Sequence, residues 1–237
     1  MSRNYIDFIS AYCDSWCERC AFTQQCSHFA VTSALAMCDG NFESALELAI
    51  GRPQEPGGKP QKKLRERMAE AFADYEEPSK RELDEIGREM DSRRARVERH
   101  PLVEVSFDYS VAGGHWFEQH EGCTVHADAA VREAVEVIQR DLFFIHVKIV
   151  RALDGKDEDP AGASWEGAVQ NDWNGSAKVA LISIERSERA WRDLAAALRD
   201  DAATVLAESL VSLGRATHEE FPRAMQFRRP GFDDRAR

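Results

Sequence analysis

Two stretches of the chain carry apolar side chains at intervals of three and four residues, which is the spacing of one face of an α-helix. The first stretch spans residues 129–154 and the second spans residues 176–214. Their apolar positions are Val131, Val135, Ile138, Leu142, Ile145 and Ile149 in the first stretch, and Ala177, Leu181, Ile184, Trp191, Leu198, Ala202 and Val205 in the second. Because neither face is stable in water by itself, we expect two long helices that pack against each other.

The remainder of the chain is predicted to be helical as well. A charged amphipathic pattern covers residues 61–77, and Ser79 and Glu82 form a capping box that starts a further helix towards Arg99. Residues 102–111 fit the spacing of a strand and also that of a helix. We favour a helix there, because an isolated strand would have no partner.

The predicted fold class is mainly α, with a multi-helix bundle and a small N-terminal Cys-rich helical module. In that module, Asn41 is the expected N-cap of a short helix. Proline and glycine dominate the stretch that follows the module, which marks a linker. The predicted organisation is a Cys-rich metal-binding module at residues 1–52, a linker at 53–60, the bundle at 61–222 and a tail at 223–237.

The composition excludes several classes of function. Of the 237 residues, 43% are hydrophobic, which is enough for a sizeable core, and the formal net charge is −11. This acidity argues against a nucleic-acid partner, because binding to phosphate requires a positive field. No stretch approaches the ~18 apolar residues of a membrane span, and no signal peptide is evident. We therefore expect a cytoplasmic protein without a membrane or nucleic-acid partner, and a protein partner remains possible.

The most specific functional signal is the segment YCDSWCERCAFTQQC, which holds four of the six cysteines. Apolar residues from Tyr5 to Trp16 recur at helical spacing, so a helix is predicted here. On a continuous helix the first three thiols share one face, and the fourth returns from the following turn. In a reducing compartment, clustered thiols indicate metal or redox chemistry rather than disulfides. The predicted metal ligands are Cys13, Cys17, Cys20 and Cys26.

Three interpretations of this cluster are open. An iron–sulfur cluster needs four cysteines and an apolar shell, which Trp16, Phe22 and Phe29 can supply, and we favour it. A structural zinc ion needs four ligands in a tetrahedron, although the segment lacks the glycine-bearing turns of common zinc knuckles. In the third interpretation the thiols hold no metal. His28 is an alternative ligand, a hydrogen-bond donor to a ligand, or an exposed side chain.

The C-x₃-C-x₂-C spacing of Cys13, Cys17 and Cys20 resembles that of radical S-adenosylmethionine enzymes, over eight residues. In that family three cysteines hold an iron–sulfur cluster, and the fourth iron stays open for the cofactor. Here Cys26 is positioned to fill that place, and Arg19 stands where the family usually carries an aromatic residue. The chain also lacks the alternating strands and helices of a barrel, and these differences separate it from that family.

A second metal site in the bundle is a further hypothesis. Helical bundles hold metals between glutamate and histidine side chains, although the Glu-x-x-His pattern of di-iron proteins does not occur in this sequence. The candidates are Glu136, His146, Glu185 and Glu188, together with His115, Glu118 and His120 in HWFEQH. The alternative is that they are solvated or paired with arginines such as Arg140, Arg189 and Arg192.

Three functions are compatible with this sequence. The first is a redox or electron-transfer protein whose N-terminal module holds a cysteine-ligated cluster. The second is an interaction or regulatory protein in which zinc staples that module. The third is a bundle oxidase with a carboxylate and histidine metal site that receives electrons from the cluster. Metal content and colour distinguish the first from the second, and a second metal in the bundle would favour the third.

Overall fold

The computed structural model describes residues 4–51, 77–120, 128–158 and 169–234. These residues form α-helices and short 3₁₀ helices and no β-strand, which confirms the predicted fold class. Contacts divide the chain into two compact units. Residues 1–86 and 229–237 form one, here called the N-terminal unit, and residues 87–228 form the other, here called the bundle. The predicted linker and, apart from Glu77, the charged helix predicted after it lie outside the described residues.

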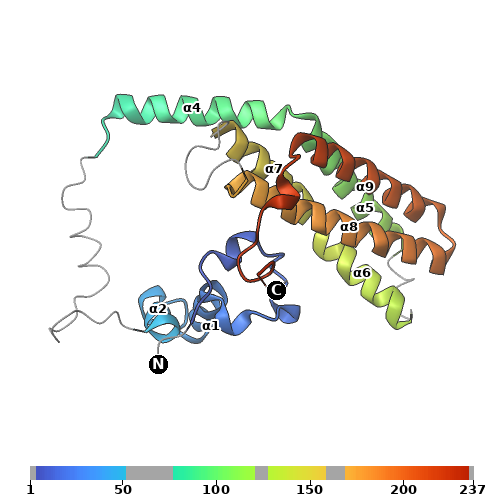
Figure 1. Cartoon of the computed structure of the whole chain (residues 1–237), viewed down its shortest axis with the longest axis horizontal. Helices are drawn as coiled ribbons and strands as arrows, with labels where there is room; N and C mark the ends of the chain where they lie inside the picture. The colour runs from blue at the N-terminus through green and yellow to red at the C-terminus, as the bar shows by residue number, and fades with distance from the viewer. Residues whose placement is uncertain (1–3, 52–76, 121–127, 159–168, 235–237) are drawn as a thin grey trace. The chain divides into compact units, whose positions relative to one another are not determined.

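Helix α8 (Asp172–Leu198) occupies the centre of the bundle (Figure 1). It packs against α6, α7, α9 and the 3₁₀ helix η4, and α5 packs against α7 and α9. The contacts of α8 with α6 and α7 confirm that the two predicted apolar faces pack together. The other bounds are α4 (Lys80–Glu98), α5 (Pro101–Gln119), α6 (Ala129–Asp141), α7 (Phe144–Glu158), α9 (Asp201–Glu220) and η4 (Ala224–Gln226).

The first predicted long helix is in fact two successive helices, α6 and α7, so the prediction of one continuous helix is wrong. The interruption falls at Leu142 and Phe143. Ser110 on α5 donates its hydroxyl to the Leu142 carbonyl at 2.6 Å, and this bond from another helix accompanies the break in the backbone ladder. Helix α7 still buries Ile145 and Ile149 completely, so the apolar face continues across the break.

The second predicted long helix is a helical hairpin, α8 followed by α9. Arg199 ends α8 in the left-handed region with φ 55°, and the chain reverses there. Asp200 then caps α9 by accepting the amides of Ala202 at 2.7 Å and Ala203 at 3.1 Å. The hairpin buries the two apolar faces against each other, which a single straight helix cannot do.

The ambiguous segment 102–111 is helical, as predicted, and lies within α5. The capping box is also confirmed, because Ser79 and Glu82 exchange hydrogen bonds at the start of α4. Gly113, in the middle of α5, allows a close approach of two helices. A Cβ at this position would lie 2.4 Å from Leu142 Cδ1, so a side chain here would displace the Leu142 side chain that packs against this glycine.

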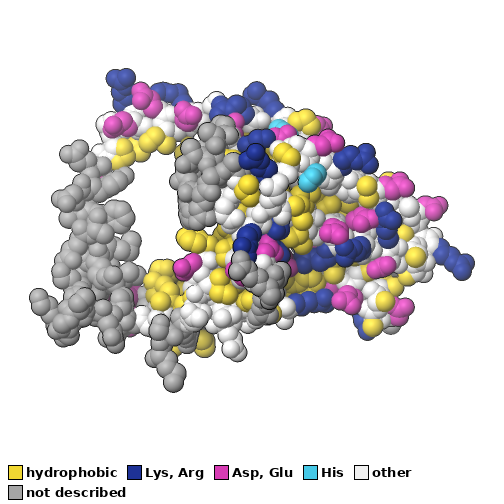
Figure 2. All heavy atoms as spheres, in the orientation of Figure 1, with side chains coloured by type: hydrophobic (Ala, Val, Ile, Leu, Met, Phe, Trp, Pro, Cys, Tyr) yellow, Lys and Arg dark blue, Asp and Glu magenta, His cyan; other side chains and the backbone are white. Residues whose placement is uncertain are grey.

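The core of the bundle is closely packed and includes one buried ion pair. Trp191 is completely buried and donates its indole N–H to the Tyr109 hydroxyl at 2.9 Å. Asp141 is also completely buried, and Arg186 binds both of its carboxylate oxygens, at 2.8 and 2.6 Å. Ser187 donates a third hydrogen bond at 3.0 Å, so this buried charge is well satisfied. Figure 2 shows acidic and basic side chains interspersed over the visible face of the bundle.

The N-terminal unit consists of short elements. Three 3₁₀ helices, η1 (Ile9–Tyr12), η2 (Cys17–Arg19) and η3 (Thr23–Gln25), precede α1 (Ser27–Met37) and α2 (Phe42–Ile50). Asn41 caps α2 by accepting the Ser44 amide at 3.0 Å, as predicted. In the described parts of both units, no helix is long and apolar enough to cross a membrane.

Candidate metal centre

The four clustered cysteines come from successive turns and not from one helix, so the helix predicted from Tyr5 to Trp16 is wrong. Cys13 follows η1, Cys17 begins η2, Cys20 follows η2 and Cys26 follows η3. Ser15 has φ 56°, in the left-handed region, which breaks any continuous helix. Local hydrogen bonds compensate, because Asp14 accepts the Trp16 amide at 3.1 Å, and short polar side chains compete with helices in this way.

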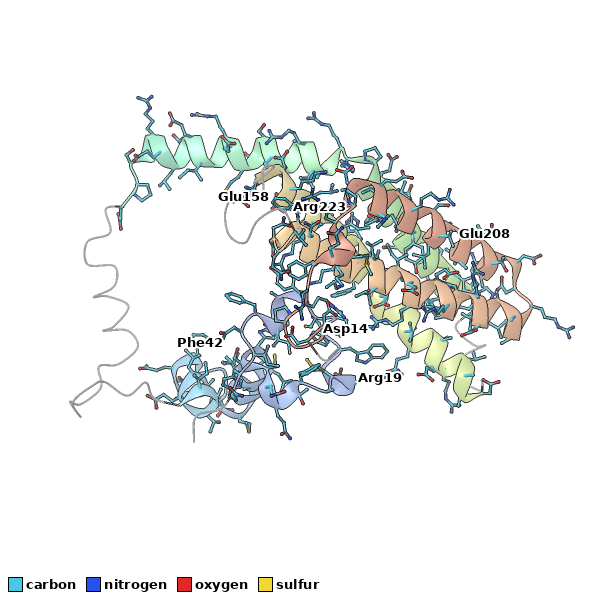
Figure 3. All side chains as sticks on the ribbon, in the orientation of Figure 1. Asp14, Arg19, Phe42, Glu158, Glu208 and Arg223 are labelled. Atoms are coloured by element: carbon cyan, nitrogen blue, oxygen red, sulfur yellow. The ribbon has the colours of Figure 1, made fainter. Side chains whose placement is uncertain are left out.

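The turns bring all four cysteines to the wall of one cavity of about 560 Å³. The four thiols are free and half-buried. Apolar side chains complete much of the wall, including Ile9, Trp16, Phe29 and Phe232. Asp14, labelled in Figure 3, lies on the loop that follows the first of the thiols and also lines the cavity. Of the residues predicted to form an apolar shell around the thiols, Trp16 and Phe29 line this cavity.

Backbone amides donate to three of the four sulfur atoms. The amides of Ser15, Phe22 and Phe29 lie 3.4 Å from the sulfurs of Cys13, Cys20 and Cys26, respectively. Cys26 also occupies the N-cap position of α1, where the helix dipole favours negative charge. Such N–H···S hydrogen bonds stabilise thiolates over thiols, and they tune the potential of a thiolate-bound cluster. The backbone therefore suits deprotonated sulfurs at Cys20 and Cys26, whereas the Cys13 thiol also donates to the Ser10 carbonyl at 3.4 Å.

The thiols lie close enough to affect one another electrostatically. Burial raises the pKa of the Cys17 thiol, and the neighbouring Cys13, Cys20 and Cys26 raise it further. Glu18 adds a smaller contribution of the same sign. These effects disfavour ionisation of the Cys17 thiol, and a cation bound beside it would oppose them.

The four cysteines share the wall of one cavity. Among the described residues, no group of three or more His, Cys, Asp and Glu side chains is arranged to hold a single metal ion. His28 is exposed and lines the cavity beside the cysteines. Cys38 follows α1 and packs against the small alanine core of α1 and α2, away from the cavity. Cys123 lies outside the described residues.

The side chains proposed for a second site in the bundle have other partners. Glu185 pairs with Arg189 and Glu188 pairs with Arg192, as the alternative interpretation predicted. His146 Nδ1 lies 2.9 Å from the Ser106 hydroxyl, and burial lowers the pKa of this histidine. The remaining candidates include three exposed residues, Glu136, His115 and Glu118, and the half-buried His120, which contacts Asp200 at 2.9 Å. None of these described residues forms a group suited to a metal ion.

Phe232 is the residue of the site that the sequence analysis missed. It lies in the segment predicted to be a tail, yet it lines the cysteine cavity. Its ring contacts Phe22 edge-on, with 5.0 Å between the ring centroids. Pro230-Gly231 marks a turn directly before this aromatic residue, but the turn does not indicate what the ring packs against.

Comparison with known proteins found no matching family model, no matching curated protein and no matching solved structure. The function is therefore argued from the site itself.

Proposed function

We propose that the N-terminal unit binds an iron–sulfur cluster and that the protein serves a redox or electron-transfer role. Cys13, Cys17, Cys20 and Cys26 are the proposed ligands. The observation that carries the proposal is their shared position on the wall of one largely apolar cavity. Cysteine thiolates are the usual ligands of such clusters, and an apolar, hydrogen-bonded surrounding controls their potential.

The geometry favours a cluster over a single zinc ion. A zinc ion requires four sulfurs at about 2.3 Å from one point. In a [4Fe–4S] cluster each thiolate binds a different iron, so the ligands are spread around the cofactor. The four thiols here line the wall of a cavity of about 560 Å³, which leaves room for an extended cofactor. This arrangement fits a cofactor that occupies the space between the thiols.

The surrounding residues have defined roles in this proposal. The amides of Ser15, Phe22 and Phe29 donate to the ligand sulfurs, which lowers the electron density on them and favours the reduced state. Trp16 and Phe29 limit the access of water to the cluster. Because the cysteines are only half-buried, electrons can exchange with a partner at this surface.

The decisive experiment is metal and sulfide analysis of the protein purified without air, together with its visible spectrum. We expect about four iron atoms and about four sulfides per chain, and colour that bleaches on reduction. Cys17→Ser is expected to lose most of the iron, because it removes one of four ligands. Cys38→Ser is the matched control and should keep it, since Cys38 is a half-buried thiol of the same unit away from the cavity. Equal iron in both variants would contradict the proposal, as would a parent protein without iron.

A second candidate function is supported by the surface of α1 and α2. Met37, Phe42, Leu48 and Ile50 are each more than half exposed, which is typical of a surface that binds a partner. In this alternative the cysteines hold zinc, and the N-terminal unit is an interaction module. The same analysis separates the two, because about one zinc per chain without colour would favour the interaction module.

A further inference from the structure

We infer that the C-terminal end of the chain forms one wall of the cysteine site and shields its thiols. The segment concerned comprises residues 229–234, which belong to the N-terminal unit although they follow the bundle in sequence. Phe232 supplies the contact with the cavity. The inference deepens the proposed function. The shielding of the thiols does not depend on that function, and only the consequence for a bound cluster rests on it.

The segment has a defined conformation of its own. Arg229 and Asp233 form an ion pair at 3.1 Å, and Asp233 also accepts the Arg229 amide at 2.9 Å. Asp234 accepts the amide of Gly231 at 3.0 Å. These bonds close the Pro230-Gly231 turn on itself. The segment is therefore a folded loop that presents Phe232 on one side.

The loop fits closely against the first turns of the chain. Gly231 is buried with φ 77°, and a Cβ there would lie 3.0 Å from side-chain atoms of both Ile6 and Ile9. Only glycine combines this backbone conformation with this fit. Beside it, Phe232 packs edge-on against Phe22, a buried residue between Cys20 and Cys26. The Arg229 guanidinium lies over the Phe232 ring, 5.0 Å from the ring centroid.

This arrangement joins residues that lie far apart in the sequence. The proposed ligands lie between Cys13 and Cys26, whereas Phe232, about 200 residues later, supplies one wall of the same cavity. The cavity is therefore closed on that side only when the segment at residues 229–234 is docked. A bound cluster and a docked C-terminal segment would then stabilise each other, since coupling between two binding events is reciprocal.

The test measures alkylation of each cysteine in the apoprotein, with peptide mass spectrometry to separate the sites. Phe232→Ala removes the ring, and Gly231→Ala keeps the ring but prevents its seating. In both variants we expect the cavity thiols to react roughly tenfold faster than in the parent, because the ring no longer covers one side of the half-buried thiols and local opening becomes more frequent. Phe232→Leu should restore most of the shielding. Phe143→Ala, an exposed phenylalanine of the bundle, is the control and should change nothing.

Cys38 serves as an internal reference, because it lies in the N-terminal unit but not on the cavity. Parental alkylation rates at the four cavity thiols in both variants would overturn the inference, whatever the iron content. An equal acceleration at Cys38 would also overturn it, since the segment would then hold the whole unit and not one wall. If only the cavity thiols are alkylated faster, and the protein never holds iron, the result would support the inferred wall and contradict only the proposed function. Selective acceleration together with faster loss of iron in air would support both.

Discussion

The bundle and the N-terminal unit are stabilised in different ways. The bundle completely buries large side chains, among them Trp191, Ile145 and Leu210. The core between α1 and α2 in the N-terminal unit consists of three alanines, Ala34, Ala45 and Ala49. Since hydrophobic stabilisation scales with the apolar area removed from water, alanines contribute much less of it per residue.

This difference indicates that the N-terminal unit needs a source of stability beyond its small apolar core. Small units cannot bury enough apolar surface to offset their loss of conformational entropy, and they commonly depend on metals or disulfides. Its described cysteines form no disulfide. Larger buried residues, Trp16 and Phe22, lie beside the thiols and not in the alanine core. We therefore expect the occupant of the cysteine cavity to contribute directly to the folding of this unit, while the bundle folds without it.

The largest expected effect is the loss of the proposed cofactor. If the cluster is bound as proposed, removing its iron with a chelator under reducing conditions should accelerate amide hydrogen exchange across residues 4–51 and leave the bundle protected. Bound metals in small thiolate modules contribute on the order of 10 kcal/mol to folding, which is enough to decide whether the unit is folded. Hydrogen exchange of the loaded and stripped protein measures both units at once. Unchanged protection of residues 4–51 would show that this unit, like the bundle, folds through its own core.

The second prediction concerns a substitution in the core of the bundle. Trp191→Ala should lower the free energy of unfolding of the bundle by about 4 kcal/mol, because it leaves a large cavity. It also deprives the buried Tyr109 hydroxyl of its donor. Urea unfolding followed by circular dichroism measures the loss, with Phe143→Ala as an exposed control. The iron content should match that of the parent, and a coupled loss of iron would mean that the two units do not fold independently.

The fold could largely be predicted from the sequence, because spacing and caps are local signals. Asn41 and the pair Ser79 and Glu82 act as caps, as their sequence context indicated. The sequence analysis failed where tertiary contacts decide the structure. The break at Leu142 involves Ser110, 32 residues away, and the reversal at Arg199 needs a left-handed residue that periodicity does not report.

The gathering of the four cysteines at one place could be predicted from the sequence, whereas the walls of the cavity could not. Four cysteines in fifteen residues can meet by several routes, so their gathering at one cavity did not require the predicted helix. The structure uses 3₁₀ turns, and Ser15 adopts the left-handed conformation that glycine usually supplies. Phe232 could not be assigned, because no local pattern indicates that a residue near the C-terminus packs against Phe22.

As the pH falls, we expect the N-terminal unit to lose its structure before the bundle does. Metal–thiolate bonds are lost as thiols take up protons, so the N-terminal unit should loosen first as the pH falls. The bundle holds carboxylates with lowered pKa values. The hydrogen bond from Lys156 lowers the pKa of Glu220. Burial would raise the pKa of Asp200, but hydrogen bonds from Ala203, Trp116 and Ala202 together lower it.

These carboxylates stabilise the bundle above their ordinary pKa values of about 4, and this contribution is lost as the pH falls through the lowered values of the folded state. Iron absorbance and bundle circular dichroism, recorded over the same pH series, should therefore change at different pH, the iron at the higher. Simultaneous loss of both signals would contradict the independence of the units, and loss of the bundle first would contradict the expected order.

The smallest expected effect comes from removing one helix N-cap in each unit. Asn41 caps α2 and Asp128 caps α6, each by accepting one amide, at 3.0 and 2.9 Å. Replacing either cap with alanine should cost about 1 kcal/mol. In the loaded protein, Asn41→Ala should accelerate amide exchange roughly fivefold throughout α1 and α2, because a unit with so small a core opens as a whole. Asp128→Ala should accelerate exchange only in the first turn of α6, since the apolar face of that helix stays packed on α8. If both variants affect only their own first turn, then the N-terminal unit has a stable core of its own, and the contrast drawn between the two units is wrong.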